Sequence, residues 1–412
     1  MAHRWWWRVF VLPAIVATLL GGLLFALIQC EDRVVPSYGT RDFIEYWSAF
    51  HVTRAGNNPY DPREMAPVQA LITGQNVTPP LMMWNPPWTL VLMAPLMSND
   101  FCLSSLWWLG INFFFLGSSI ALVREIGVRG EGTLSVTPYL VCFSLVMLAP
   151  AMRAMMIGQL GVLLLWSGLL LWFSLQNKLA LLAGFSFVLL SCKPHLFVPL
   201  FLVVGAIALV ERWTRFYLSV LLCGLLLVSG VWAMQRRLFE WWFAGIVDPV
   251  QGAPMISQWI TSSPLNILVT ESGLKGDLSV QRLLLLLPVL VGLGLLAWIE
   301  RGSQRDNVDR WYPIVVGVSL LVTPFAWLFD YGLMGALTLP MVFRSFEGKR
   351  AAKYRWLVAL LGLALPLAAL LIFVPLGGES IPAVYFVWYA PLLFTWYFIA
   401  CALLKDAAHQ AA

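Results

Sequence analysis

The sequence predicts an all-α membrane protein that crosses the bilayer many times, and three observations support this fold class. Apolar residues make up 60% of the 412 positions and charged residues 11%, against roughly 45–50% and about 25% in soluble domains. The apolar residues form runs that can cross about 30 Å of hydrocarbon. These runs recur from Val9 to Leu404, with short charged stretches between them. A soluble globular protein is excluded, and we expect one transmembrane domain over residues 1–412.

The apolar runs predict about twelve membrane-spanning helices. The run at 179–192 is short, and those at 311–326 and 328–343 are nearly fused, so about eleven to thirteen helices fit the pattern. The segment 88–97 is too short to cross, and fits a re-entrant or interfacial turn or an extension of the neighbouring span. The expected spans are 9–29, 101–123, 134–151, 158–175, 179–192, 196–210, 216–234, 283–299, 311–326, 328–343, 357–376 and 384–403.

The basic residues orient these spans. The first span follows Arg4 and Arg8 and lacks a small-residue cleavage site before Cys30, so we expect a retained anchor with the N-terminus inside. Alternating sides from there places 16 of the 26 basic residues in inside loops and leaves 10 in the longer outside loops. Cytoplasmic loops are enriched in Lys and Arg. The charge distribution therefore supports this topology.

Two long stretches, 30–87 and 235–282, fall outside. Loops longer than about 15 residues are usually functional or disordered. In the first stretch, aromatic residues at helical spacing lie opposite Asp42 and Glu45, which predicts a short amphipathic helix on the outer membrane surface. A second helix is expected from Pro62 to about residue 72. The spaced aromatics are Phe43, Trp47 and Phe50, and those of the second stretch are Phe239, Trp241, Trp242 and Phe243.

Polar residues at the ends of the spans are the candidate functional residues. Each ionisable residue costs about 2.5–3.5 kcal/mol at the bilayer centre, so such residues near a membrane are informative. The topology places all of the strongest candidates outside, and we expect a site at the outer membrane boundary. They are Arg153, Gln159, Lys193, His195, Asp330 and Tyr331, and they face the same side as Asp42 of the first long stretch.

Each candidate also has a structural explanation. Asp42 in a first helical turn is explained equally well by the helix dipole. Lys193 and Arg153, taken singly, are better explained as side chains that reach lipid phosphates. Gln159 fits a helix-end cap, and His195 after a proline fits a structural residue.

The remaining composition points to no cofactor. The six cysteines are scattered without a CxxC spacing or a nearby histidine cluster, so neither a disulfide framework nor a zinc site is expected. The net charge of +5 is ordinary for a membrane protein and gives no indication of a nucleic-acid partner.

Several short motifs resemble one family. Residues 42–49 (DFIEYWSA) and 56–61 (GNNPYD) resemble the first-loop signature of the polyprenyl-phosphate-sugar-dependent membrane glycosyltransferases, glycosyltransferase family 87, which are related to mycobacterial phosphoinositide mannosyltransferases and arabinofuranosyltransferases. The resemblance continues in order from about 38 to 215. The further motifs are Asn85-Pro86-Pro87, Ala94-Pro95-Leu96, Gly158-Gln159, Ala183-Gly184 and Cys192-Lys193-Pro194.

The resemblance implies a fold and an activity. It implies a C-type glycosyltransferase architecture in the cell membrane. Such an enzyme moves a mannose-like hexose or an arabinofuranose from a polyprenyl-phosphate donor to a lipid or glycan acceptor at the outer face, with inversion and with no cofactor or metal. Asp42 takes the place of the catalytic base, and Lys193 and Arg153 would bind the donor phosphate. The further substrate-binding candidates are Glu45, Tyr46, Asn57, Tyr60, Asp61, Asn85, Gln159, His195, Asp330 and Tyr331.

The sequence departs from the family pattern at two places. Asn85 stands where the family commonly has Tyr, and the motif at 323–327 (TPFAW) lacks the histidine that commonly follows it, with Asp330 near that position. We expect acceptor recognition in 235–282 and around 323–331. The competing interpretations are a transporter or flippase of a lipid-linked sugar, and a non-catalytic protein that binds one. Transporters usually place polar groups near the bilayer midplane within repeated helices, and neither feature is evident here.

Overall fold

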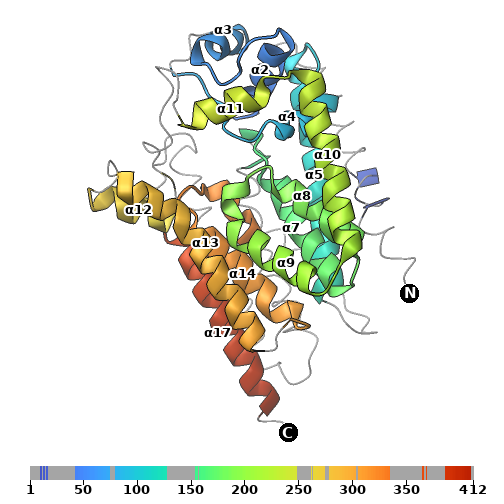
Figure 1. The fold of residues 1–412 in the computed structure, drawn as a ribbon, viewed down its shortest axis with the longest axis vertical. Coiled ribbons are helices and arrows are strands. Elements are labelled where there is room, and N and C mark those ends of the chain that lie inside the picture. The colour runs from blue at the N-terminus through green and yellow to red at the C-terminus, as the bar shows by residue number, and fades with distance from the viewer. Residues whose placement is uncertain are drawn as a thin grey trace.

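The fold is a bundle of helices with a layer of shorter helices at one end (Figure 1). In the computed structural model, the part of the chain that is described leaves out most of four expected spans, 9–29, 134–151, 328–343 and 357–376, and also Arg153. The described residues are 10–11, 13, 15–16, 42–74, 79–127, 154–155, 157–247, 261, 263–273, 278–302, 305–334, 364–365, 368 and 386–409.

Every regular element among these residues is helical, which confirms the all-α prediction. The elements are α2 (Phe43–Arg54), α3 (Pro62–Thr73), α4 (Trp88–Met93), η2 (Ala94–Leu96), α5 (Phe101–Gly127), α7 (Gly161–Gln176), α8 (Ala180–Leu190), η3 (Pro194–Leu196), α9 (Val198–Val210), α10 (Thr214–Met234), α11 (Leu238–Val247), α12 (Pro264–Glu271), α13 (Leu278–Arg301), α14 (Val308–Val322), η5 (Leu328–Tyr331) and α17 (Tyr389–His409).

Helix α7 is the centre of the bundle. Its residues from Gly161 to Leu175 are all buried, as expected for a helix that is apolar on every side. It packs against α5, α8 and α14, while α8 packs against α10. A second group forms where α9 contacts α13 and α14, and α14 contacts α17. The cluster of shorter helices α2, α3 and α11 lies at one end of this bundle (Figure 1).

Two helices expose long rows of leucine. Large contiguous apolar patches are rare on soluble monomers, and such rows suit a helix that faces lipid. The two described helices that are long and apolar enough to span a membrane are α5 and α10. The number of spans stays a prediction. The exposed leucines are Leu218, Leu221, Leu222, Leu225 and Leu226 on α10, and Leu283, Leu286, Leu290 and Leu293 on α13.

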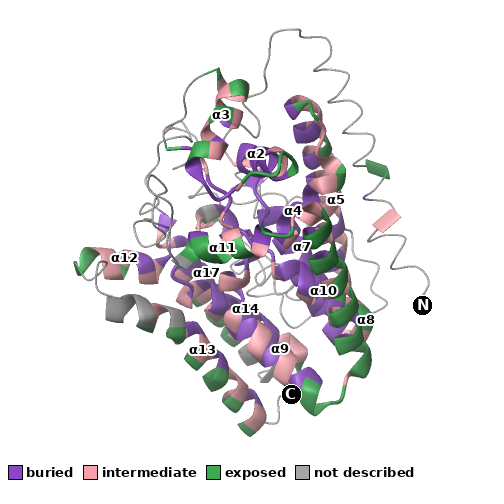
Figure 2. Cartoon of the chain, turned by 45° about the horizontal axis from the view of Figure 1, so that its top comes forward, coloured by how far each residue is buried: buried purple, intermediate pink, exposed green. Residues whose placement is uncertain are grey.

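The stretch 30–87, which the charge distribution predicts to be outside, contains both predicted helices, but one of them is not amphipathic. Helix α3 matches the predicted range and exposes Leu71 by 82%. Helix α2, in contrast, buries its residues from Phe43 to Ala49, about two full turns. In Figure 2 most of α2 has the colour of buried residues. The prediction of an amphipathic surface helix was wrong for α2, because its polar residues Glu45 and Tyr46 find partners inside the protein.

The segment 88–97 forms the short helix α4 followed by η2, and α5 begins separately at Phe101. It is therefore not an extension of that helix. Helix α4 packs against α10. The two outer stretches meet here, since the indole Nε1 of Trp242 on α11 donates to the carbonyl of Trp84 at 3.2 Å, and its ring lies 5.8 Å from that of Trp88.

Candidate active site

Asp42 lies where α2 begins, and the backbone fixes it beside the turn that leads into α7. The amide of Asp42 donates to the carbonyl of Ile157 at 3.0 Å. Gly158 follows with φ +77°, and a Cβ there would lie 2.4 Å from the Cβ of Phe43. The indole of Trp108 donates to the carbonyl of Gly158 at 2.8 Å. Glycine is thus required at 158 both by its conformation and by the close approach of α2.

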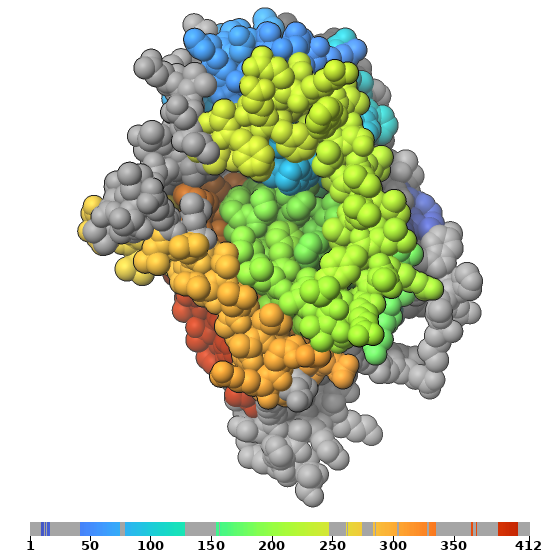
Figure 3. Space-filling view, viewed as in Figure 1, coloured from blue at the N-terminus to red at the C-terminus, as the bar shows by residue number. Residues whose placement is uncertain are grey.

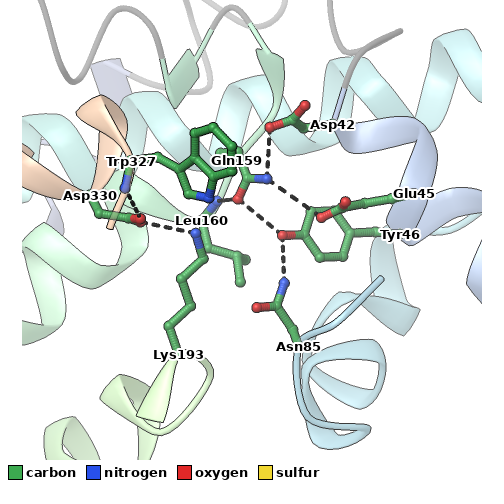
Figure 4. A network of polar contacts seen from close by, with 9 residues as sticks. All are labelled: Asp42, Glu45, Tyr46, Asn85, Gln159, Leu160, Lys193, Trp327 and Asp330. Carbon is green, nitrogen blue, oxygen red and sulfur yellow. Dashed lines mark hydrogen bonds and ion pairs between the residues drawn. The ribbon is translucent and has the colours of Figure 1, made fainter. Parts of the chain in front are cut away.

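The next residue, Gln159, joins the polar side chains of the site (Figure 4). Its Nε2 donates to Oδ2 of Asp42 at 2.7 Å and lies 3.5 Å from Oε1 of Glu45. Its Oε1 accepts from the hydroxyl of Tyr46 at 3.1 Å. One amide therefore bridges two carboxylates and a phenol, all three of them at the start of α2.

Asn85 completes this network from a third segment. Its Nδ2 donates to the hydroxyl of Tyr46 at 2.8 Å. Asn85, Gln159, Glu45 and Tyr46 are all buried, whereas Asp42 is half-buried. The carboxylate of Asp42 is thus the member of the network that lies nearest the surface.

Electrostatics separate the two carboxylates. Burial raises the pKa of Glu45 well above its usual value, and the neighbouring charge of Asp42 raises it further. Hydrogen bonds from Tyr46 and Gln159 and the charge of Lys193 oppose that shift without reversing it. Pairs of carboxylates in unlike environments are typical of acid–base chemistry. In this pair Glu45 favours the neutral acid.

A buried ion pair forms the second part of the site. Lys193 Nζ lies 2.9 Å from Oδ1 of Asp330, and the two side chains are 6% and 1% exposed. The other carboxylate oxygen of Asp330 accepts from the amide of Trp327 at 3.0 Å. The ammonium also lies 4.7 Å from the centre of the Phe329 ring. Lys193, expected to meet a donor phosphate, therefore has a carboxylate partner already.

Two further predicted residues lie beside this ion pair in the chain. Burial and the nearby charge of Lys193 lower the pKa of His195 to about 4, so its imidazole is neutral at physiological pH. Tyr331 is fully buried, with its ring 6.5 Å from that of Tyr389. Both residues fit a structural role, as the sequence suggested for His195.

Three predicted residues of the first outer stretch make local contacts. Asp61 caps α3 by accepting from the amide of Arg63 at 2.9 Å and pairs with its guanidinium at 2.6 Å. Asn57 donates to Glu64 at 2.9 Å. The buried hydroxyl of Tyr60 lies 3.5 Å from the carbonyl of Asn85. These contacts give all three residues a structural explanation.

Sequence reasoning missed the pairing of Lys193 with Asp330 and the contribution of Phe329. A signal was present, because a buried charge needs a partner and these two residues of opposite charge were both placed on the outer side. Within the described residues, no group of three or more His, Cys, Asp or Glu side chains could hold a metal ion.

The model of glycosyltransferase family 87 matches residues 84–324, more than half of the chain. The chain belongs to glycosyltransferase family 87. This confirms the family that the motifs predicted. Neither a curated protein nor a solved structure matches the chain. Family membership indicates a glycosyltransferase that uses a sugar donor and an acceptor, and together with the apolar helices it indicates a membrane protein.

The matched region includes Gln159 and Lys193 but neither Asp42 nor Asp330. Both of these carboxylates contact it directly, Asp42 through the amide of Gln159 and Asp330 through the ammonium of Lys193. The hydrogen bonds thus join the acidic residues outside the match to the glycosyltransferase region.

Proposed function

We propose that this glycosyltransferase moves a sugar, a mannose-like hexose or an arabinofuranose, from a polyprenyl-phosphate donor to a lipid or glycan acceptor at the outer face of the membrane. Transfer proceeds with inversion at the anomeric carbon. The observation that carries the proposal is the half-buried carboxylate of Asp42, which Gln159 holds at 2.7 Å beside the buried Glu45.

In this reaction Asp42 is the general base. It removes the proton of the acceptor hydroxyl while that oxygen attacks the anomeric carbon, and the bond from that carbon to the phosphate oxygen breaks. The polyprenyl phosphate leaves with the bonding electrons and so gains a second negative charge. It needs no general acid, because the second pKa of a phosphate monoester is only about 6. The products are the glycosylated acceptor, the polyprenyl phosphate and a proton on Asp42.

Lys193 is the proposed cation for the leaving phosphate, because phosphates need fixed positive partners in a dry site. In the structure Asp330 occupies that partner position at 2.9 Å. The donor phosphate would therefore compete with Asp330 for the ammonium. Arg153, the second proposed phosphate ligand, is among the residues outside the described part.

The apolar surface fits a lipid-linked donor. Helices α10 and α13 both expose rows of leucine. On the face shown in Figure 3, the surface is hollowed between α10 and α11 on one side and α13 on the other, with residues of the α7 to α9 region at its floor. A prenyl chain reaches such a surface from the bilayer and not from water, so the leucines accept it without any polar group losing a partner.

The test is a donor panel. Purified protein in lipid nanodiscs is incubated with polyprenyl-phosphate mannose, polyprenyl-phosphate arabinofuranose and the matching nucleotide sugars. We expect one polyprenyl-phosphate sugar to be consumed and polyprenyl phosphate to be released in equal amount, and NMR of the product to show an inverted anomeric centre. Consumption of a nucleotide sugar instead, or a retained centre, would overturn the proposal. Binding of the lipid-linked sugar without its consumption would favour a non-catalytic protein.

A further inference from the structure

We propose that Tyr46 and Gln159 are positioning residues for sugar transfer, and that the hydrogen-bonded chain from Asn85 through Tyr46 to Gln159 fixes the one amide orientation that serves Asp42. The inference rests on the proposed function of Asp42 as the base. It assigns no contact with substrate to Tyr46 or Gln159. Their effect on the reaction is through the geometry and ionisation of the carboxylate.

The direction of each hydrogen bond follows from the donor at the far end. The Nδ2 of Asn85 can only donate, so the hydroxyl of Tyr46 accepts from it at 2.8 Å. The hydroxyl then uses its own proton toward Oε1 of Gln159 at 3.1 Å. An amide whose carbonyl faces Tyr46 must present its NH₂ group on the other side, where Asp42 lies at 2.7 Å.

The opposite orientation of the Gln159 amide is unfavourable both toward Asp42 and toward Tyr46. It would place the carbonyl of Gln159 against the carboxylate of Asp42, bringing two acceptors together. It would also turn the NH₂ group toward a hydroxyl that already accepts from Asn85. Without the hydroxyl of Tyr46, only the carboxylate end would discriminate between the two orientations.

Burial makes this selection strong. Tyr46 is 0% exposed, Gln159 6% and Asn85 8%, so water does not readily substitute for a missing partner. The hydroxyl of Tyr46 is also within hydrogen-bonding reach of Glu45. Because burial and Asp42 hold the pKa of Glu45 high, its neutral form is a weaker competitor for the Tyr46 proton than a carboxylate would be.

The predicted effect on the reaction has two parts. Hydrogen bonds to a carboxylate favour its ionised form, so loss of the Gln159 donor moves the acid limb of the kcat/KM profile to higher pH. Loss of orientation misplaces the base, and misplacement by about 1 Å costs up to about 100-fold in rate. Donor binding lies elsewhere in the site, so KM for the donor should not change.

The test compares two buried tyrosines. Tyr46→Phe removes the hydroxyl that fixes Gln159, and Tyr312→Phe removes an equally buried hydroxyl that donates to the carbonyl of Gly168 at 2.6 Å. We expect Tyr46→Phe to lower kcat by about 10- to 100-fold and to shift the acid limb upward. Tyr312→Phe should lower Tm but keep both kcat and the pH profile.

Two more variants keep the test decisive if Tyr46→Phe does not fold. Asn85→Ala removes the first donor without touching the tyrosine ring, and should shift the acid limb in the same direction by a smaller amount. Gln159→Glu keeps the size of the side chain but places an acceptor against Asp42, and should cost more activity than either.

Asp42→Asn is measured in parallel to separate the positioning role of Tyr46 and Gln159 from the role of Asp42 as the base. The positioning role alone would be overturned if Asp42→Asn is inactive while Tyr46→Phe keeps the wild-type kcat and pH profile. If Tyr46→Phe does not fold, the same result in Asn85→Ala and Gln159→Glu would overturn it. Equal losses of kcat in Tyr46→Phe and Tyr312→Phe would do the same. Full activity in Asp42→Asn would overturn the proposed base, and the positioning role with it.

Discussion

At each end of helix α7 a glutamine amide donates a hydrogen bond to an aspartate, but the surroundings of the two aspartates differ. At the C-terminal end, the amide of Gln176 and the indole of Trp172 both donate to one oxygen of Asp309. At the N-terminal end, the single amide of Gln159 serves both Asp42 and Glu45. Two donors on one carboxylate make a stable junction between α7 and α14. At the N-terminal end one amide is shared between Asp42, which is half-buried, and Glu45, whose pKa is raised by burial and by the charge of Asp42.

The comparison also explains why the candidate site is at one end only. Polar residues at a helix end are common, and the hydrogen bonds from Trp172 and Gln176 to Asp309 stabilise the contact of α7 with α14. What distinguishes the other end is the gathering of two carboxylates from α2 around a residue of the glycosyltransferase region, with a buried lysine close enough to affect the pKa of Glu45. We expect chemistry at this end and only stability at the other.

The largest effect is expected from the buried ion pair near the Asp42 end. Lys193→Ala or Asp330→Ala alone leaves an unpaired buried charge and should cost about 3–5 kcal/mol in the free energy of unfolding. The double variant removes both charges and should recover most of that loss. Denaturant melts in detergent measure the stability, and donor titrations measure KM.

The double variant also tells whether Lys193 has only a structural role, like the residues that contact Asp309. We expect it to be stable but poor in its use of the polyprenyl-phosphate donor, because the cation for the phosphate is missing. A double variant that is stable and has the wild-type KM for the donor would give Lys193 a structural role only.

A smaller effect is expected at the turn that brings α2 to α7. Gly158→Ala strains a residue at φ +77° and puts a methyl group 2.4 Å from Phe43, which should cost about 2–5 kcal/mol. The matched control is Gly74→Ala, with φ +66° and no atom within 4 Å of the added carbon; it should cost only about 1–2 kcal/mol. Thermal melts compare the two, and equal losses would show that the approach of α2 is not the constraint.

Glu45→Gln should have a milder effect on stability, and the size of that effect depends on pH. The folded protein holds the pKa of Glu45 above its usual value, so its contribution to stability is complete below about pH 4.3 and is lost as the pH rises toward the folded pKa. Glutamine keeps the shape and cannot ionise. The variant should therefore lose less stability than wild type between about pH 5 and pH 8, and should lose less activity than Asp42→Asn. An unchanged pH slope would mean that Glu45 is ionised in the fold.

The last prediction concerns the sides of the membrane that the loop after α2 and the loop after α7 face. Single cysteines replacing Asn57 and Asn177, both exposed, should react with a membrane-impermeant reagent from opposite sides of sealed vesicles. Cysteine-free protein is the background. Labelling of both from outside would contradict the topology that the basic residues predict.

Local patterns in the sequence predicted a large part of the fold. The all-α class follows from the apolar runs and the range of α3 from the start signal at Pro62, and the structure agrees with both. The burial of α2 did not follow, because periodicity around Phe43 and Trp47 describes one face and gives no information on what covers the other.

The candidate site was predictable as a set of residues and not as a geometry. Gln159, Lys193 and Asp330 were selected as polar residues at span ends, and Asp42 was selected from the first long stretch and its motif. The opposite charges of Lys193 and Asp330 were a signal for one pairing, but local patterns did not give either contact, because Gln159 lies 117 positions from Asp42 and Lys193 lies 137 from Asp330. Contacts over such separations depend on how the helices pack, which no local pattern reports.

The most direct measurement of the central claim is the rate of sugar transfer in Asp42→Asn beside Asp309→Asn, with donor binding and Tm recorded on the same samples. Asparagine keeps the size of the side chain and cannot take a proton. We expect Asp42→Asn to bind the donor and to keep its Tm while kcat falls by about 10²–10⁴-fold, and Asp309→Asn to lose Tm and keep kcat. Full activity in Asp42→Asn would contradict the claim. A parallel loss of Tm and donor binding in that variant would contradict it too, and would give Asp42 the structural role of stabilising the start of α2 through the helix dipole.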